Sequence, residues 1–175
     1  QGRHAFAVHL ALWEPDGAFL SAATVDLPAQ GLTRSVLDDA AQPAALPTDR
    51  PVRIVASRSR PPATLPLTVE ILGRRLAEAG ITDAGVEIID VGSVGAKVNE
   101  IISGRAEAYV HDTGFFEWDV AAPYGVAHHY GLVPSHLDGR EVLFNAMPPY
   151  VTDLVVSHPQ LVAHLRAALR EAASS

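Results

Sequence analysis

The feature that most constrains the fold is an alternation of strand-like and helix-like segments that begins at residue 52 and continues almost to residue 172. Short apolar runs, which are typical of buried strands, are each followed by a segment with helical spacing. Strands are predicted over 52–56, 85–91, 106–111 and 154–157, and helices over 65–79, 94–103, 120–130 and 161–172. This alternation indicates a layered α/β domain with a mixed sheet.

Before residue 52 the pattern changes to pure strand alternation. Residues 4–13 and 18–27 enclose Pro15-Asp16-Gly17, a turn signal, and therefore predict a β-hairpin. Residues 30–36 indicate one more short strand. The Asp-, Ala- and Pro-rich segment 37–51 lacks any period, so we expect an exposed loop there.

A second, smaller hairpin is predicted near the other end of the chain. Residues 132–135 and 142–145 flank Leu137-Asp138-Gly139, which has the composition of a tight turn. Neither an internal repeat nor a linker divides the sequence. We therefore expect a single domain over 1–175.

Composition narrows the classes of partner. The chain has 175 residues with 13 basic and 20 acidic side chains, a net charge of −7. This excess of acidic residues disfavours a nonspecific nucleic-acid or anionic-membrane surface. With no cysteine, a disulfide or a cysteine-ligated metal is excluded. No apolar run is long enough to span a bilayer and no signal peptide is evident, so the expected location is cytoplasmic.

The most informative stretch is 117–123, Glu-Trp-Asp-Val-Ala-Ala-Pro, at the start of the predicted helix 120–130. At 100° per residue, Asp119 falls in line with Pro123 and Val126 on the stripe that should face the core. A carboxylate there is costly to bury unless a cation or several donors meet it. Because proline lacks an N–H, the carbonyl of Asp119 is also left free. Spacing leaves a helix N-cap and a metal or catalytic role both open.

Two further segments are candidates for binding an anion. Gly92 and Ser93 lead from a strand into a helix whose first free N–H groups suit a phosphate, and Lys97 lies one turn inside that helix. The alternative is a serine N-cap with a lysine that reaches solvent. Ser57 to Arg60 leaves the end of another strand, a usual place for ligand contacts, although Arg60 could simply be a solvated side chain.

Other conspicuous residues are assigned structural roles. His128 and His129 are adjacent on a helix and point about 100° apart, so they cannot share one metal ion without distortion. We expect His128 to face water. Tyr109 and Trp118 are interpreted as core or rim residues rather than substrate contacts.

The segment Glu117-Trp118-Asp119-x-Ala121-Ala122-Pro123, followed by Ser135-His136-Leu137-Asp138-Gly139, resembles the second signature of the inositol monophosphatase superfamily. Members are lithium-sensitive, Mg²⁺-dependent phosphatases, and the chain is most similar to the bacterial 3′(2′),5′-bisphosphate nucleotidases. The resemblance implies an αβαβα sandwich, of which this chain is the carboxy-terminal portion. It implies that Asp119 is a Mg²⁺ ligand. It also implies a small phosphate ester, 3′-phosphoadenosine 5′-phosphate, as substrate, and allows a homodimer.

The same resemblance assigns the substrate-binding residues. The family's nucleotidases have a segment similar to Gly92–Lys97, in which the positions of Ser93 and Lys97 contact the nucleotide. It implies contacts by Ser57 and by the last residue of its loop, where many relatives have histidine and this chain has Arg60. Such an arginine could pair with a phosphate or stack on a base.

The family's first signature, Asp-Pro-(Ile/Leu)-Asp-Gly-Thr, and its upstream glutamate do not occur in this sequence. These supply most of the metal ligands and orient the attacking water, so the chain has no catalytic residue of its own and should be inactive alone. One hypothesis is a phosphatase whose first part is absent. The other is a noncatalytic anion-binding module. Inositol or sugar phosphates are the rival substrates.

Overall fold

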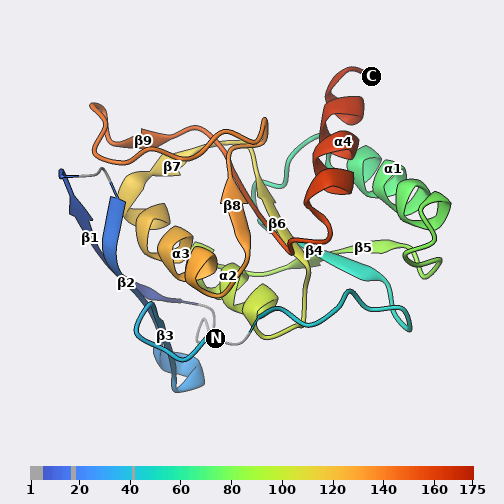
Figure 1. Ribbon diagram of the computed structural model, residues 1–175. Helices are drawn as coiled ribbons and strands as arrows, with labels where there is room; N and C mark the ends of the chain where they lie inside the picture. The colour runs from blue at the N-terminus through green and yellow to red at the C-terminus, as the bar shows by residue number, and fades with distance from the viewer. Residues whose placement is uncertain (1–5, 17–18, 41) are drawn as a thin grey trace.

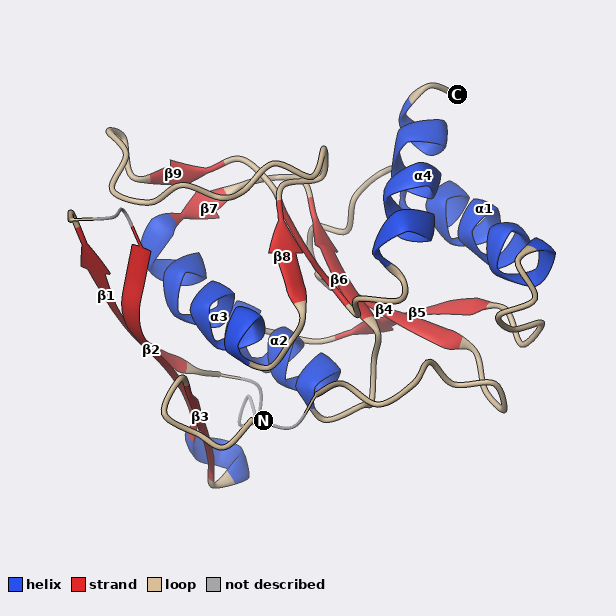
Figure 2. Cartoon of the chain, in the orientation of Figure 1, coloured by secondary structure: helices blue, strands red, loops and turns tan. Residues whose placement is uncertain are grey.

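The two larger of three β-sheets and two pairs of helices form alternating layers in the computed structural model, which describes residues 6–16, 19–40 and 42–175. Figure 1 shows a small sheet on the left, helices α2 and α3 beside it, then a larger sheet, and finally helices α1 and α4 on the right. Figure 2 shows the same arrangement with strands in red and helices in blue. The predicted layered α/β architecture is thereby confirmed.

The small sheet contains β1 (Val8–Glu14), β2 (Phe19–Leu27) and β3 (Leu32–Ser35) in that order, all antiparallel. The predicted hairpin and the third short strand are therefore confirmed. The predicted positions 4, 5, 17 and 18 lie outside the described residues. A short 3₁₀ turn, Pro28–Gln30, joins β2 to β3. Ala23, Val25 and Leu27 of β2 point inward, because residues two apart share a face, and they pack against Ala96, Ala122 and Val126 of the middle helices.

The large sheet is mixed, with the strand order β5-β4-β6-β10-β8. Strand β4 runs parallel to both β5 and β6, whereas β10 is antiparallel to β6 and β8. The strands are β4 (Val52–Ala56), β5 (Val86–Asp90), β6 (Ala108–His111), β8 (Val133–Ser135) and β10 (Leu154–Ser157). Because β5, β4 and β6 are neighbours and parallel, their carboxyl ends meet at one edge of the sheet.

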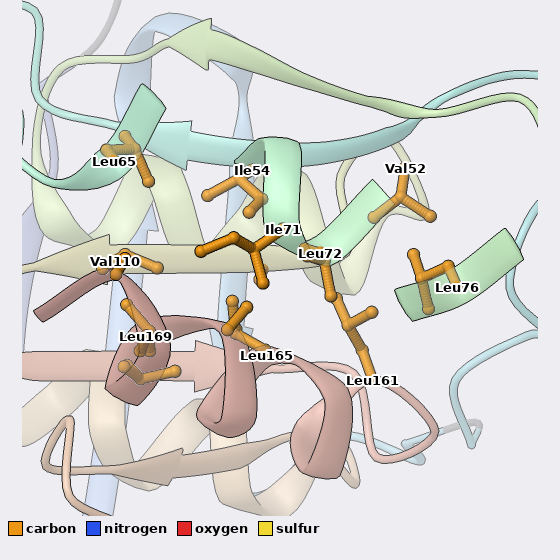
Figure 3. Packing of buried hydrophobic residues seen from close by; sticks show 14 of the residues in the cluster. Val52, Ile54, Leu65, Ile71, Leu72, Leu76, Val110, Leu161, Leu165 and Leu169 are labelled. Carbon is orange, nitrogen blue, oxygen red and sulfur yellow. The ribbon is translucent and has the colours of Figure 1, made fainter. Parts of the chain in front are cut away.

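Helices cover both faces of the large sheet. Helices α1 (Leu65–Glu78) and α4 (Val162–Ala173) pack against one another on its outer face. Figure 3 shows their apolar side chains, Leu72 and Leu165 among them, meeting those of the strands. Helices α2 (Val94–Ile102) and α3 (Glu117–His129) lie on the inner face and so fill the layer between the two sheets.

Two details of the predicted secondary structure are wrong. Strand β8 pairs with β10, and residues 142–145 form no strand, so the second hairpin does not exist. The turn after Ser135 does form, with the N–H of His136 bonded to the carbonyl of Arg140 at 2.8 Å. The chain then leaves as an irregular segment and returns as β9 (Tyr150–Val151), which pairs with β7 (Phe115–Phe116), two short strands that the sequence did not predict.

No helix among the described residues covers the outer face of the small sheet (Figure 1). Val8, Leu10 and Leu12 alternate along β1 and project away from α2 and α3, with 49%, 68% and 55% of their surface exposed. Strand β1 is also the end strand of its sheet, so within the described residues its outer edge pairs with no other strand. A row of apolar side chains beside an open strand edge is a typical site for further packing.

Candidate active site

Three loops meet at the edge where the parallel strands β5, β4 and β6 end. Crevices at the carboxyl ends of parallel strands are where α/β folds usually bind ligands. One loop follows each strand: 57–64 after β4, 91–93 after β5, and 112–114 after β6. The predicted site residues all lie in these loops or in the first turns of the helices that they reach. They are Ser57, Arg60, Gly92, Ser93, Lys97 and Asp119.

Ser93 connects β5 to α2 in a strained conformation. Its φ angle is +55°, which a residue with a side chain rarely adopts. It occupies the N-cap position of α2, but its side chain makes no capping hydrogen bond. The capping interpretation of Ser93 is therefore wrong, and its hydroxyl remains available to a ligand. Strain of this kind persists mostly where function requires it, and the first N–H groups of α2 open toward the same point.

Lys97 lies one turn into α2 and is buried, with 5% of its surface exposed. Its Nζ atom lies 4.9 Å from the centre of the Tyr109 ring. Burial, together with the positive charge of Arg60, lowers the pKa of Lys97 to about 8. Within the described residues Lys97 forms no ion pair, and it does not reach solvent as the alternative interpretation required. A buried ammonium beside another cation is a position that an anion would stabilise.

The loop after β4 is held by Ser57. The backbone N–H of Arg60 donates to the Ser57 hydroxyl at 3.3 Å, and the Ser59 hydroxyl lies 3.5 Å from the same oxygen. Arg60 itself is exposed, and no carboxylate pairs with it in the part of the chain that the structure describes. Its charge is still felt inside the site, because it helps to lower the pKa of both Lys97 and His111.

Asp119 lies inside the first turn of α3 rather than at its cap. The helix begins at Glu117, earlier than the predicted Val120, and its N-cap residue is Phe116. The N-cap interpretation of Asp119 is therefore wrong. Its half-buried carboxylate makes no hydrogen bond or ion pair with the described residues. The negative charge nevertheless acts on the site: burial chiefly raises the pKa of Tyr109, and Asp119 adds to that rise.

The fit to Mg²⁺ is only partial. This ion prefers octahedral coordination by oxygen, usually from carboxylates, phosphates and water. Asp119 can supply one such oxygen ligand. In residues 6–16, 19–40 and 42–175, however, no group of three or more histidine, aspartate or glutamate side chains could hold a metal. A complete Mg²⁺ site would need ligands from beyond these residues, so the role of Asp119 as a ligand stays a prediction.

Other polar residues of α3 have structural tasks. The Glu117 carboxylate accepts hydrogen bonds from the N–H groups of Asn145 and Ala146, at 2.8 and 2.9 Å, and thereby fixes the segment that replaces the predicted hairpin. His128 is exposed as expected, and His129 Nε2 bonds to the carbonyl of Asp38 at 2.8 Å. Trp118, one residue before Asp119, is 61% exposed and stacks on Phe116, so it is not a core residue.

Two buried polar side chains near the site were not assigned to it from the sequence. Tyr109 and His111 lie two residues apart on β6, at its carboxyl end. The signal was present, since a Tyr-x-His pair at the end of an apolar run places both polar groups on one face. The pair is a candidate for ligand binding only because Lys97 lies against Tyr109, and that contact can be seen only in the fold.

Comparison with known proteins agrees with the motifs. No protein family model matches the chain. Proteins named 3′-phosphoadenosine 5′-phosphate phosphatase from Mycobacterium bovis and Mycobacterium tuberculosis are each 33% identical over 180 residues, and one from Mycobacterium leprae is 34% identical over 179 residues. These matches cover 97–98% of this chain but only 61% of each relative, so the chain spans about three-fifths of their length.

Solved structures give the fold independently. An inositol monophosphatase from Zymomonas mobilis superposes with a TM-score of 0.68 at 13% identity, covering 97% of this chain and 64% of that one. CysQ from Bacteroides thetaiotaomicron, described as a bacterial member of the inositol monophosphatase family, gives 0.66 at 21% identity, with 89% and 63% covered. No helix among the described residues is long and apolar enough to cross a membrane. The chain therefore has the fold of the inositol monophosphatase family and is related in sequence to enzymes named 3′-phosphoadenosine 5′-phosphate phosphatase.

Proposed function

We propose that this chain is the carboxy-terminal, substrate-binding part of a Mg²⁺-dependent phosphatase that removes the 3′-phosphate of 3′-phosphoadenosine 5′-phosphate. The named relatives support the reaction, and their match extends over nearly the whole chain. The observation that carries the proposal is the meeting of Ser93, Lys97 and Arg60 at the edge where β5, β4 and β6 end. Asp119 enters the same edge from α3.

The chemistry of this edge suits a substrate with two phosphates. Lys97 and the open start of α2 can hold one phosphate, by a charge-assisted bond and by free N–H groups. Arg60 lies in a separate loop and offers a guanidinium, which can bind a second phosphate in bidentate fashion. Asp119 provides an oxygen ligand for a divalent cation at the phosphate that is to be removed. When bound, Mg²⁺ would polarise the phosphoryl oxygen and stabilise the developing charge.

We infer that the rest of the site comes from further polypeptide of the same protein. One carboxylate cannot complete a Mg²⁺ site, and about two-fifths of each named relative has no counterpart in this chain. The apolar row of Val8, Leu10 and Leu12 and the open edge of β1 offer a surface for that polypeptide to cover. That polypeptide would cover the apolar face of β1 and supply the missing metal ligands.

The test compares the 175-residue chain with the protein encoded by the whole reading frame. The chain alone should release no phosphate from 3′-phosphoadenosine 5′-phosphate, AMP or inositol 1-phosphate. The whole protein should hydrolyse the first of these preferentially, with Mg²⁺ and with inhibition by lithium. In the whole protein Lys97→Ala should cost about 1.5–3 kcal/mol in kcat/KM, the usual scale for a hydrogen bond to a charged group, and mainly for the bisphosphate.

Each alternative has a distinct outcome. Equal losses on all three substrates would mean that Lys97 does not distinguish a second phosphate, and an inositol or sugar phosphate would then be the better substrate. A whole protein that binds phosphate esters but hydrolyses none would be a noncatalytic module. Mg²⁺-dependent turnover by the 175-residue chain would overturn the inference that ligands are missing from it.

A further inference from the structure

Two polar atoms beside the proposed site are buried without a hydrogen-bond partner. Tyr109 is completely buried and His111 is 3% exposed. Within the described residues neither the Tyr109 hydroxyl nor His111 Nδ1 has a partner. Leaving such a group unpaired lowers the stability of the fold, so native proteins rarely do so without a reason. The two rings lie 6.1 Å apart on the same face of β6, which α2 covers.

The hydrogen bonds of His111 determine what its free nitrogen can do. His111 Nε2 lies 3.3 Å from both the carbonyl oxygen of Gly114 and the hydroxyl of Thr113. A carbonyl can only accept, so the bond to Gly114 requires the proton on Nε2, and the Thr113 hydroxyl is then a second acceptor. In the neutral ring Nδ1 then has a lone pair and can only accept. Burial, opposed by the Gly114 carbonyl but aided by the charges of Lys97 and Arg60, lowers the pKa of His111 and favours this neutral form. The ring stacks on Phe115 at 4.3 Å, which fixes its orientation.

The nearby cation restricts the ligand further. Lys97 Nζ lies over the Tyr109 ring, so an anion that pairs with Lys97 would come close to Tyr109 and His111. A phosphate oxygen would repel the Nδ1 lone pair, because both are acceptors. The ligand that satisfies all three groups therefore carries a hydroxyl donor on the same molecule as its phosphate. A ribose hydroxyl in a nucleotide and a ring hydroxyl in inositol phosphate both have this chemistry.

We propose that Tyr109 and His111 are specificity-determining residues of the substrate site, where His111 Nδ1 accepts a hydrogen bond from a hydroxyl group of the phosphorylated substrate and Tyr109 binds the same hydroxyl-bearing ring. This inference rests on the proposed function, since it assumes that Lys97 binds the substrate phosphate. In this proposal two residues of β6 recognise the sugar or inositol ring of the substrate, whereas α2 binds its phosphate.

The test measures binding to the 175-residue chain by isothermal titration calorimetry with AMP, 2′,3′-dideoxyadenosine 5′-monophosphate and inositol 1-phosphate. The chain should bind AMP about 2- to 10-fold more tightly than the dideoxy analogue, the range expected for one hydrogen bond. His111→Phe keeps the stacking on Phe115 but lacks Nδ1, so it should bind AMP and the analogue equally. Tyr109→Phe should reduce the preference. Lys97→Ala, the matched control, should weaken both ligands by the same factor.

The stability of the variants distinguishes a role in substrate recognition from a purely structural role. Because its hydroxyl is unpaired, Tyr109→Phe should unfold at a urea concentration equal to or above that of the wild type. His111→Phe also loses the bond from Nε2 to the Gly114 carbonyl, so it should unfold at a lower urea concentration but remain folded without urea. His111→Phe with an intact preference for AMP would refute the proposal, as would a wild type that binds AMP and its analogue equally or not at all. If the variants lose affinity for inositol 1-phosphate and the wild type prefers it over AMP, the proposal stands while the nucleotide substrate fails.

Discussion

The two larger sheets of this molecule differ in how completely helices cover their faces. The five-stranded sheet has α1 and α4 on one face and α2 and α3 on the other, and strands such as β4 are buried along their whole apolar length. The three-stranded sheet has helices on its inner face alone, within the described residues. The difference shows which part of the candidate site has a fully packed support. Ser57 and Ser93 follow strands of the five-stranded sheet, and Lys97 lies in the helix that begins directly after Ser93.

The middle helices belong to both regions. One face of α2 packs on the large sheet through Val98 and Ile101, and Ala96 faces the small sheet. The start of α3 similarly lies between the two. The proposed anion-binding residues are therefore supported by a core with helices on both faces of its sheet. The proposed metal ligand Asp119 instead borders the sheet whose outer face is open. Substitutions on the two sides should accordingly differ in their effects, and the following four predictions test that difference.

The largest difference is expected between two leucines. Leu72 is completely buried between α1 and the large sheet, so Leu72→Ala should lower the free energy of unfolding by about 2–5 kcal/mol. Leu10 on the outer face of β1 is 68% exposed, and Leu10→Ala should change it by less than about 0.5 kcal/mol. Urea unfolding of both variants, followed by circular dichroism, measures the two costs.

A large cost for Leu10→Ala would contradict the comparison. If that cost grew with protein concentration, the outer face of β1 would be buried in a homodimer, which the family resemblance allows. Repeating the titration at two protein concentrations therefore belongs to the same experiment.

The second prediction concerns Lys97, the buried charged residue of α2. Burial holds the pKa of Lys97 near 8, below its usual value of 10.5. A lysine whose pKa is lowered in the folded state destabilises the fold fully below pH 8, where both states are protonated. Between pH 8 and 10.5 the unfolded chain binds more protons, so stability rises with pH. Lys97→Met should therefore be more stable than the wild type at pH 7, by about 2–3 kcal/mol.

Urea unfolding of both proteins at pH 7, 8, 9 and 10 checks this prediction. The advantage of Lys97→Met should shrink as the pH rises through the window, because the wild-type lysine becomes neutral. Groups that titrate there far from Lys97 are common to both proteins and cancel in the difference. A constant difference across the series would show that Lys97 retains its charge, and hence that an anion or water compensates it in the folded chain.

Much of this architecture could be predicted because periodicity reports burial. Residues 52–56 were predicted as a strand with the bounds that the structure has, since Val52, Ile54 and Val55 are buried on both faces of a parallel strand. The predicted hairpin at 142–145 failed for the opposite reason. Val142 and Phe144 pack against Tyr124 of α3, and Glu117 takes the N–H groups of the next two residues. Neither contact is local in the sequence.

The candidate site was predictable to the extent that its residues form local motifs. Ser93 and Lys97 lie in one loop and one helix turn, so their spacing indicated an anion site. Tyr109 and His111 acquire meaning only because β6 lies next to β4 and beneath α2, which is a matter of strand order. Periodicity also could not distinguish a cap from a first-turn position at Asp119, because the start of a helix is set by its contacts.

The third prediction compares two glycines that face different regions. A Cβ atom at Gly95 would lie 2.6 Å from both His9 Nε2 and Val25 Cγ1, on the side of α2 that meets the small sheet. Gly95→Ala should therefore lower the free energy of unfolding by about 1–3 kcal/mol. A Cβ at Gly73 of α1 would meet its nearest atom, Val86 Cγ2, at 3.8 Å, so Gly73→Ala should stabilise by about 0.5–1 kcal/mol.

Thermal unfolding of the two alanine variants and the wild type shows whether each substitution raises or lowers the unfolding temperature. If Gly95→Ala were as stable as Gly73→Ala, α2 would not be held against the small sheet, and the shared layer between the two regions would be looser than the packing indicates.

The smallest effect on folding is expected at Asp119, where the two regions meet. Its carboxylate caps nothing and pairs with no described residue, so Asp119→Asn should cost less than about 1 kcal/mol, the loss of one negative charge near a helix start. In the whole protein the same substitution should abolish Mg²⁺-dependent release of phosphate, because an amide is a poor substitute for a carboxylate ligand. Asp112→Asn, an exposed position in the loop after β6, is the matched control and should retain activity. Retained turnover in Asp119→Asn would remove it from the metal site, and a cost as large as that of Leu72→Ala would make it a structural carboxylate instead.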